Sequence, residues 1–158
     1  MVRQLAPWHE NLEKRQVRSP KIYVRDTGLL HQLLGIKLER DLLRHPKLGG
    51  SWEGYLVEEL IKRVEPDESY FWATHNGAEM DLLLFKDGRR LGFEIKRQDA
   101  PGLTPSMRIA IEDLGLERLT VLYPGTRAYD LARNVRVVPA VALVSSDVLN
   151  FLRSGMAS

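Results

Sequence analysis

Apolar and polar residues alternate along residues 78–98, AEMDLLLFKDGRRLGFEIKRQ. A period of two is typical of a β-strand with one apolar face. Asp87-Gly88 lies at the midpoint, and this dipeptide favours a two-residue hairpin turn. The segment is therefore predicted to form a β-hairpin in which Lys86 faces Arg89 and the pairing continues outward from the turn.

Three charged residues lie inside the predicted strands. In this register Asp81 faces Glu94, and Lys96 lies two residues further on the same side of the hairpin. The opposite side is predicted to carry the apolar residues Met80, Leu82, Leu84, Leu91, Phe93 and Ile95. One face would then be an apolar layer, and the other would carry two carboxylates and an ammonium.

A helix is predicted over residues 51–64, SWEGYLVEELIKRV, because apolar residues recur there at three- and four-residue spacing and Ser51 can cap it. Glu53 lies four residues before Val57, on the same apolar stripe. Its carboxylate is therefore expected to point toward the structure that the helix packs on. Three other charged residues of this helix, Glu58, Glu59 and Lys62, are expected to face water.

The remaining pattern supplies further elements. A strand over 22–24 and a helix capped by Asp26 or Thr27 precede Gly35, and one or two more helical turns are expected within 37–50. Strands are predicted at 69–75 and 118–123, around a helix that Ser106 caps and Gly115 ends. Beyond these, a short helix, a strand over 135–138 and a terminal helix are expected; residues 1–18 show no long apolar period.

The element order from residue 51 is helix, three strands, helix, strand, which predicts an α/β fold with a mixed central sheet flanked by helices. Pro46 and the Gly49-Gly50 pair favour a break. Residues 1–48 are therefore interpreted as an N-terminal connecting segment and residues 49–158 as the main domain.

Composition narrows the class of protein. The chain has 158 residues, 44% hydrophobic and 28% charged, which is typical of one folded domain. It has no cysteine, so disulfides, thiolate nucleophiles and cysteine-based zinc sites are excluded, and a reducing cytoplasm is expected. The sequence shows neither an export signal nor a membrane-spanning run, and no phosphate loop of the G-x-x-x-x-G-K-[ST] type for ATP. A net charge of +2 permits a nucleic-acid partner without requiring one.

Facing carboxylates repel each other, so a cation near the Asp81–Glu94 pair is expected to compensate their charge. A divalent metal is one such cation, since Mg²⁺ and Mn²⁺ take oxygen ligands and keep water in their remaining positions. Such a water can attack a phosphorus, with Lys96 orienting it or neutralising charge on the phosphate. Glu53 could complete the site from the helix. The alternative is an ordinary solvated face, on which Lys96 pairs with Glu79, its opposite number.

The pattern of Glu53 on a helix, Asp81 on a strand and Glu94-Ile95-Lys96 on the paired strand resembles the PD-(D/E)XK nuclease superfamily. That resemblance implies a restriction-endonuclease-like core, a catalytic set of Glu53, Asp81, Glu94 and Lys96, and Mg²⁺ or Mn²⁺ held by Asp81, Glu94 and Glu53. Met80 stands where a proline often precedes the aspartate.

A closer resemblance covers nearly the whole chain. It rests on the segments LAPWHENLEKRQVRSPKIYVRDTGLLHQLLG, HPKLGGSWEGYLVEEL, FWATHNGAEMDLLL, FEIKRQDAP and DLGLERLTVLYPG. Together they resemble domain-of-unknown-function family 4143, which follows an AAA+ ATPase module in many bacterial and archaeal proteins and is assigned to the nuclease-like fold. The resemblance implies a winged-helix remnant before the core and an ATPase partner in the same full-length chain, of which residues 1–158 would be the C-terminal part.

Three functions remain open from the sequence. The first is a metal-dependent phosphodiesterase that acts on DNA. The second is a catalytically inactive module that binds nucleic acid or protein and regulates an associated ATPase. In the third, the carboxylates only stabilise the fold.

Overall fold

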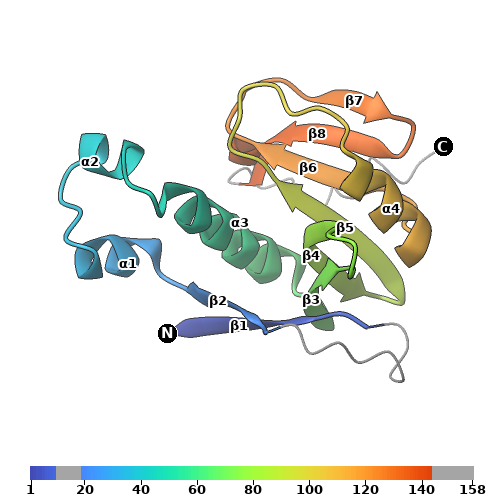
Figure 1. Ribbon diagram of the computed structural model, residues 1–158, viewed down its shortest axis with the longest axis horizontal. Coiled ribbons are helices and arrows are strands. Elements are labelled where there is room, and N and C mark those ends of the chain that lie inside the picture. The colour runs from blue at the N-terminus through green and yellow to red at the C-terminus, as the bar shows by residue number, and fades with distance from the viewer. Residues whose placement is uncertain (10–18, 144–158) are drawn as a thin grey trace.

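The computed structural model describes residues 1–9 and 19–143 (Figure 1). In this part of the chain eight strands form one mixed sheet, in the order β2-β1-β3-β4-β5-β6-β8-β7. The strands are β1 (Val2–Pro7), β2 (Lys21–Val24), β3 (Glu68–Ala73), β4 (Glu79–Lys86), β5 (Arg89–Ile95), β6 (Leu119–Tyr123), β7 (Tyr129–Ala132) and β8 (Val135–Pro139).

Two apolar cores lie on the two faces of the sheet. Helix α3 (Leu48–Val64) contributes Leu56, Val57 and Leu60 to one core, and helix α4 (Pro105–Leu114) contributes Met107 and Ala110 to the other. The order α3, β3, β4, β5, α4, β6 is the predicted one. The prediction of an α/β fold with a mixed sheet between helices is therefore confirmed.

The N-terminal segment is part of the same sheet. Strand β1 pairs in parallel with β3 through Ala6 and Tyr70, and antiparallel with β2 on its other side. Helix α1 (Thr27–Leu33) is capped as predicted, because the side chain of Asp26 accepts the backbone N–H of Leu29. Helix α2 (Glu39–Leu43) follows, and no described helix is long and apolar enough to span a membrane.

Helix α3 begins earlier than predicted. It starts at Leu48 and includes Gly49 and Gly50, which were predicted to form a break. Ser51 does not cap this helix; its hydroxyl lies 2.7 Å from His31 Nε2 instead. The apolar stripe that α3 packs on the sheet provides most of its stability, so the two glycines in its first turn are tolerated.

Helix α4 also begins at a different cap. Thr104, rather than Ser106, has the extended backbone of an N-cap, and its side chain accepts the N–H of Met107. Pro105 then occupies the first helical position, where its missing N–H costs nothing. The predicted end of this helix is confirmed, because Gly115 adopts the left-handed conformation with φ of 59°.

Two strands were missed by the sequence pattern. Strand β1 buries one apolar side chain, Leu5, completely, and it forms through its pairing with β2 and β3. The short helix predicted before the strand over 135–138 is wrong: Tyr129–Ala132 form β7, antiparallel to β8. The predicted strand over 135–138 is confirmed as β8. A 3₁₀ turn, Ala140–Leu143, follows β8, and the predicted terminal helix lies outside the described residues.

The β4–β5 hairpin has the predicted turn and register. Lys86 pairs with Arg89, and the pairing runs outward to Leu82 and Phe93. Asp87 and Gly88 both have positive φ, 50° and 74°, as a tight hairpin turn requires.

The predicted division of this hairpin into one apolar and one polar face is wrong. Leu82 and Leu84 pack in the α3 core, whereas Met80 packs in the α4 core. Between the two positions β4 carries a bulge, because the β3–β4 pairing shifts from Tyr70–Leu83 to Trp72–Met80. The extra residue in β4 switches the side on which the side chains project. Both faces of the sheet are therefore apolar and covered by helices.

Candidate functional site

The bulge in β4 brings Asp81 to the point where β4 and β5 separate. The pairing between these strands ends at Leu82–Phe93, and beyond it Glu94 and Ile95 pair with β6. Asp81 bridges the opening, because its Oδ2 accepts the Ile95 N–H at 2.9 Å. Its own N–H donates to Glu94 Oε2 at 3.4 Å. The two predicted carboxylates therefore lie together, joined by bonds between side chain and backbone.

Lys96 pairs with Glu94, through Nζ and Oε1, at the end of β5. The alternative in which Lys96 pairs with Glu79 is therefore wrong. Glu79 instead contacts Lys21, which comes from β2.

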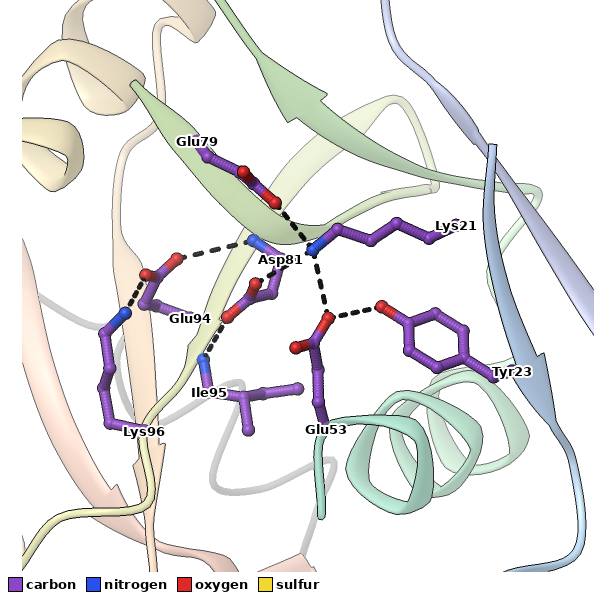
Figure 2. A network of polar contacts seen from close by, with 8 residues as sticks. All are labelled: Lys21, Tyr23, Glu53, Glu79, Asp81, Glu94, Ile95 and Lys96. Carbon is purple, nitrogen blue, oxygen red and sulfur yellow. Dashed lines mark hydrogen bonds and ion pairs between the residues drawn. The ribbon is translucent and has the colours of Figure 1, made fainter. Parts of the chain in front are cut away.

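Lys21 is the centre of the site, although the sequence pattern did not predict it there (Figure 2). Its Nζ lies 3.0 Å from Glu53 Oε1, 2.9 Å from Glu79 Oε1 and 3.1 Å from Asp81 Oδ1. The prediction that Glu53 points toward the sheet is confirmed by this contact. Helix α3 and strands β2 and β4 therefore meet at one ammonium.

Tyr23 also enters the site from β2. Its hydroxyl donates a hydrogen bond to Glu53 Oε1, the oxygen that also accepts from Lys21. Lys21 and Tyr23 are two residues apart, so they project from the same side of the strand. This period-two pair is the sequence signal that could have placed β2 at the site.

Burial and charge perturb the titration of both central carboxylates. Burial raises the pKa of Asp81, the charge of Glu53 raises it further, and Lys21 partly offsets both effects. Burial and the charge of Asp81 raise the pKa of Glu94 to about 7, although Lys96 opposes this change. The two lysines therefore do not compensate fully for the negative charge that surrounds Asp81 and Glu94.

The two lysines and the tyrosine respond to the same carboxylates. Burial by itself lowers the pKa of Lys21, but the charges of Asp81 and Glu53 outweigh it and raise the pKa above its ordinary value. The pKa of Lys96 is raised against the effect of burial by Glu94. Burial and the hydrogen bond to Glu53 raise the pKa of Tyr23.

The charges of the site do not balance. Four carboxylates belong to the network of Figure 2, and two ammonium groups face them. With all six groups ionised, the network carries two excess negative charges. The carboxylates are Glu53, Glu79, Asp81 and Glu94, and the ammonium groups are those of Lys21 and Lys96.

The donor chemistry suits a hard divalent cation, because every carboxylate oxygen here is a ligand type that Mg²⁺ and Mn²⁺ accept. Within residues 1–9 and 19–143, however, no three His, Cys, Asp or Glu side chains are grouped closely enough to hold a metal. The Lys21 ammonium lies between Glu53 and Asp81 in this arrangement. The donor type and the charge therefore suit a divalent cation, but with Lys21 between Glu53 and Asp81 the carboxylates are not spaced as a metal site.

A second carboxylate of α3, that of Glu58, is buried against the prediction. Glu58 was expected to face water, yet its side chain is only 1% exposed. It accepts hydrogen bonds from Arg3 of β1 and from Arg25, which follows β2. Burial alone raises the pKa of Glu58, but the two arginines outweigh it and the pKa is lowered. Glu58 is expected to anchor the β1–β2 edge to α3. Glu59, at the neighbouring position, pairs with Lys62 and Arg63 on the helix surface.

Comparison with known proteins found two similar curated proteins. The chain is 50% identical over 146 residues to the uncharacterized proteins Rv2008c of Mycobacterium tuberculosis and Mb2031c of Mycobacterium bovis. The match covers 92% of this chain but only 33% of each relative, so the chain spans about a third of their length. No solved structure gave a significant match.

Two family models match the chain. The model of one domain of unknown function, DUF8612, matches residues 1–40. The model of another, DUF4143, matches residues 48–143, which contain Glu53, Asp81, Glu94 and Lys96. That match spans more than half of the chain, and the chain therefore belongs to the family described as a domain of unknown function, DUF4143.

Proposed function

We propose that this domain is a metal-dependent phosphodiesterase of the PD-(D/E)XK type that acts on DNA. The observation that carries the proposal is the charge of the site: four carboxylates face two ammonium groups, and the pKa values of Asp81 and Glu94 are raised. One divalent cation would neutralise the two excess negative charges. A purely structural ion-pair network has no need of such an excess.

Asp81 and Glu94 would hold the Mg²⁺ or Mn²⁺, with Glu53 as a third oxygen ligand. When bound, the metal would lower the pKa of a coordinated water and stabilise the leaving oxygen of a phosphodiester. Lys96 lies beside Glu94 with a third of its side chain exposed, so its ammonium can neutralise negative charge that builds on the phosphate. The Ile95 N–H fixes the orientation of Asp81 by donating to Oδ2.

The proposal extends to the longer protein. The curated relatives are about three times as long as the matched segment. We propose that this domain follows an AAA+ ATPase module in the same full-length chain, and that DNA is the partner of this domain.

Asp81→Ala provides the test of activity. Purified protein is incubated with supercoiled plasmid and with single-stranded DNA, in Mg²⁺ or Mn²⁺. We expect nicking by the wild-type chain, and a loss of about 100-fold or more in the variant because it lacks a ligand. Asp130→Asn is the matched control, since Asp130 pairs with Arg136 at the far end of the sheet. Equal nicking by wild type and Asp81→Ala, or none at high protein concentration, contradicts the proposal.

A second candidate function is a non-catalytic module that binds nucleic acid or protein and regulates an associated ATPase. It is favoured by Lys21, which already forms ion pairs with three of the four carboxylates. Calorimetry with Mn²⁺ separates the two candidates. Absence of metal binding, together with retained binding to DNA or to the ATPase part of the longer protein, favours this second function.

A further inference from the structure

The Lys21 ammonium lies where a divalent cation would have to enter. It is within 3.1 Å of oxygens on both Glu53 and Asp81, two of the three carboxylates assigned to the metal. A lysine ammonium and a divalent cation repel each other, and they compete for the same oxygens. The two cations are therefore not expected to occupy these oxygens at once.

Lys21 is built into the site from outside the helix–hairpin core. It belongs to β2, at one end of the strand order, and among the described strands β2 pairs with β1 alone. Its side chain is 21% exposed, and its ammonium lies 5.5 Å from the centre of the Phe71 ring. The long lysine stem lets the ammonium move away without a change in the backbone of β2.

Glu79 gives the displaced ammonium a partner. It contacts Lys21 Nζ at 2.9 Å, and its side chain, 46% exposed, is the most accessible of the three that contact Lys21. Because Glu79 is not among the carboxylates assigned to the metal, it can keep its ion pair when the other two contacts break. Lys21 thus has a route from the centre of the site to its rim.

We propose that Lys21 is a built-in counter-cation that competes with the divalent metal for Asp81 and Glu53 and so sets the metal affinity of the site. This inference rests on the proposed function for the identity of the metal ligands. In the metal-free protein Lys21 neutralises part of the carboxylate charge, and metal binding requires its displacement. Lys21 therefore acts as a positioning residue whose removal strengthens metal binding.

The test is calorimetric titration of Mn²⁺ into the metal-free chain at pH 8, above the pKa of Glu94. Lys21→Met removes the ammonium and keeps an unbranched stem. We expect its Kd for Mn²⁺ to fall at least about tenfold below the wild-type value, which corresponds to about 1.4 kcal/mol. Lys21→Arg keeps a cation and should stay close to wild type, as should Lys62→Met, which removes a surface lysine paired with Glu59.

Thermal unfolding with and without Mn²⁺ is the second readout, and Lys21→Gln is the substitute if Lys21→Met does not fold. Both variants should melt below wild type without metal and gain more from Mn²⁺. Equal or weaker Mn²⁺ binding by Lys21→Met and Lys21→Gln overturns the inference, even if the wild type nicks DNA. Tight Mn²⁺ binding by these variants without any nicking supports it and removes only the proposed activity. Failure of every variant to bind Mn²⁺ contradicts both proposals.

Discussion

Two carboxylates of α3, Glu53 and Glu58, lie five residues apart and both contact the β1–β2 edge. The balance of charge around them is opposite. Glu58 is one buried carboxylate with two guanidinium partners, and its pKa is lowered. Glu53 belongs to a group of four carboxylates with two ammonium partners, in which the pKa values of Asp81 and Glu94 are raised. The first cluster has more positive than negative charge, and the second has the reverse.

The two charge balances imply two different roles, stabilisation of the fold for the Glu58 cluster and ligand binding for the Lys21 site. Arginine is suited to a fixed, buried ion pair because its planar guanidinium forms several hydrogen bonds at once, as Arg3 does with both oxygens of Glu58. Lysine is a mobile point charge, and Lys21 holds carboxylates that repel each other. The Glu58 cluster is therefore expected to hold the edge strands β1 and β2 in place. The Lys21 site keeps an excess of negative charge, which a cationic ligand can neutralise.

The largest effect is expected when Glu58 loses both cations. In the double variant Arg3→Met with Arg25→Met, Glu58 stays buried without a partner. We expect the free energy of unfolding at pH 7 to fall by about 3–5 kcal/mol in urea titrations. Arg63→Met is the control, because it breaks only a surface pair with Glu59 and should cost about 0.5 kcal/mol or less. A double variant as stable as this control would remove the contrast between the two clusters.

The two clusters should respond to pH with opposite sign. The pKa of Glu94 is raised in the folded state, so its contribution to stability is full below its unfolded pKa and is lost as the pH rises toward 7. The lowered pKa of Glu58 gives stability that is present at neutral pH and is lost in acid.

Comparison of wild type with Glu94→Gln isolates the first of these effects. Without metal, we expect the variant to become more stable relative to wild type between pH 5 and pH 8, by on the order of 1–3 kcal/mol. Chemical denaturation at several pH values measures this difference. Glu117→Gln, at an exposed carboxylate paired with Arg89, should show no such trend. A constant difference across the pH range contradicts the assignment of this effect to Glu94.

The smallest expected effect is a gain in stability at Asp81. Asn has the shape of the neutral carboxylic acid, the form that a raised pKa favours. Asp81→Asn is therefore expected to stabilise the metal-free protein slightly at pH 7, while it weakens Mn²⁺ binding. Thermal denaturation with the Asp130→Asn control checks the first effect, and calorimetry the second. Loss of stability in Asp81→Asn would show that the ion pair with Lys21 outweighs the repulsion.

Local sequence signals determined the hairpin and the ends of several elements. Asp87-Gly88 specifies a tight turn by itself, so the register from Lys86–Arg89 to Leu82–Phe93 followed from two residues. Gly115 ends α4 for an equally local reason, its left-handed backbone. The spacing of apolar residues in α3 placed Glu53 toward the sheet. The same register predicted that Asp81 lies beside Glu94; the strand pairing ends at Leu82–Phe93, but hydrogen bonds from Asp81 N–H to Glu94 and from Ile95 N–H to Asp81 keep the two residues together.

Three features depend on contacts between residues far apart in the chain, and only the tertiary structure determined them. Strand β1 has little apolar pattern and exists because β2 and β3 pair with it. The burial of Glu58 requires Arg3 and Arg25, which lie more than thirty positions away in the chain. In the sequence Lys21 is one of 23 lysine and arginine residues, and only the position of β2 brings it to carboxylates of α3 and β4. The sequence specified the carboxylates through local periodicity, but the cation that faces them came from an edge strand whose position only long-range pairing could set.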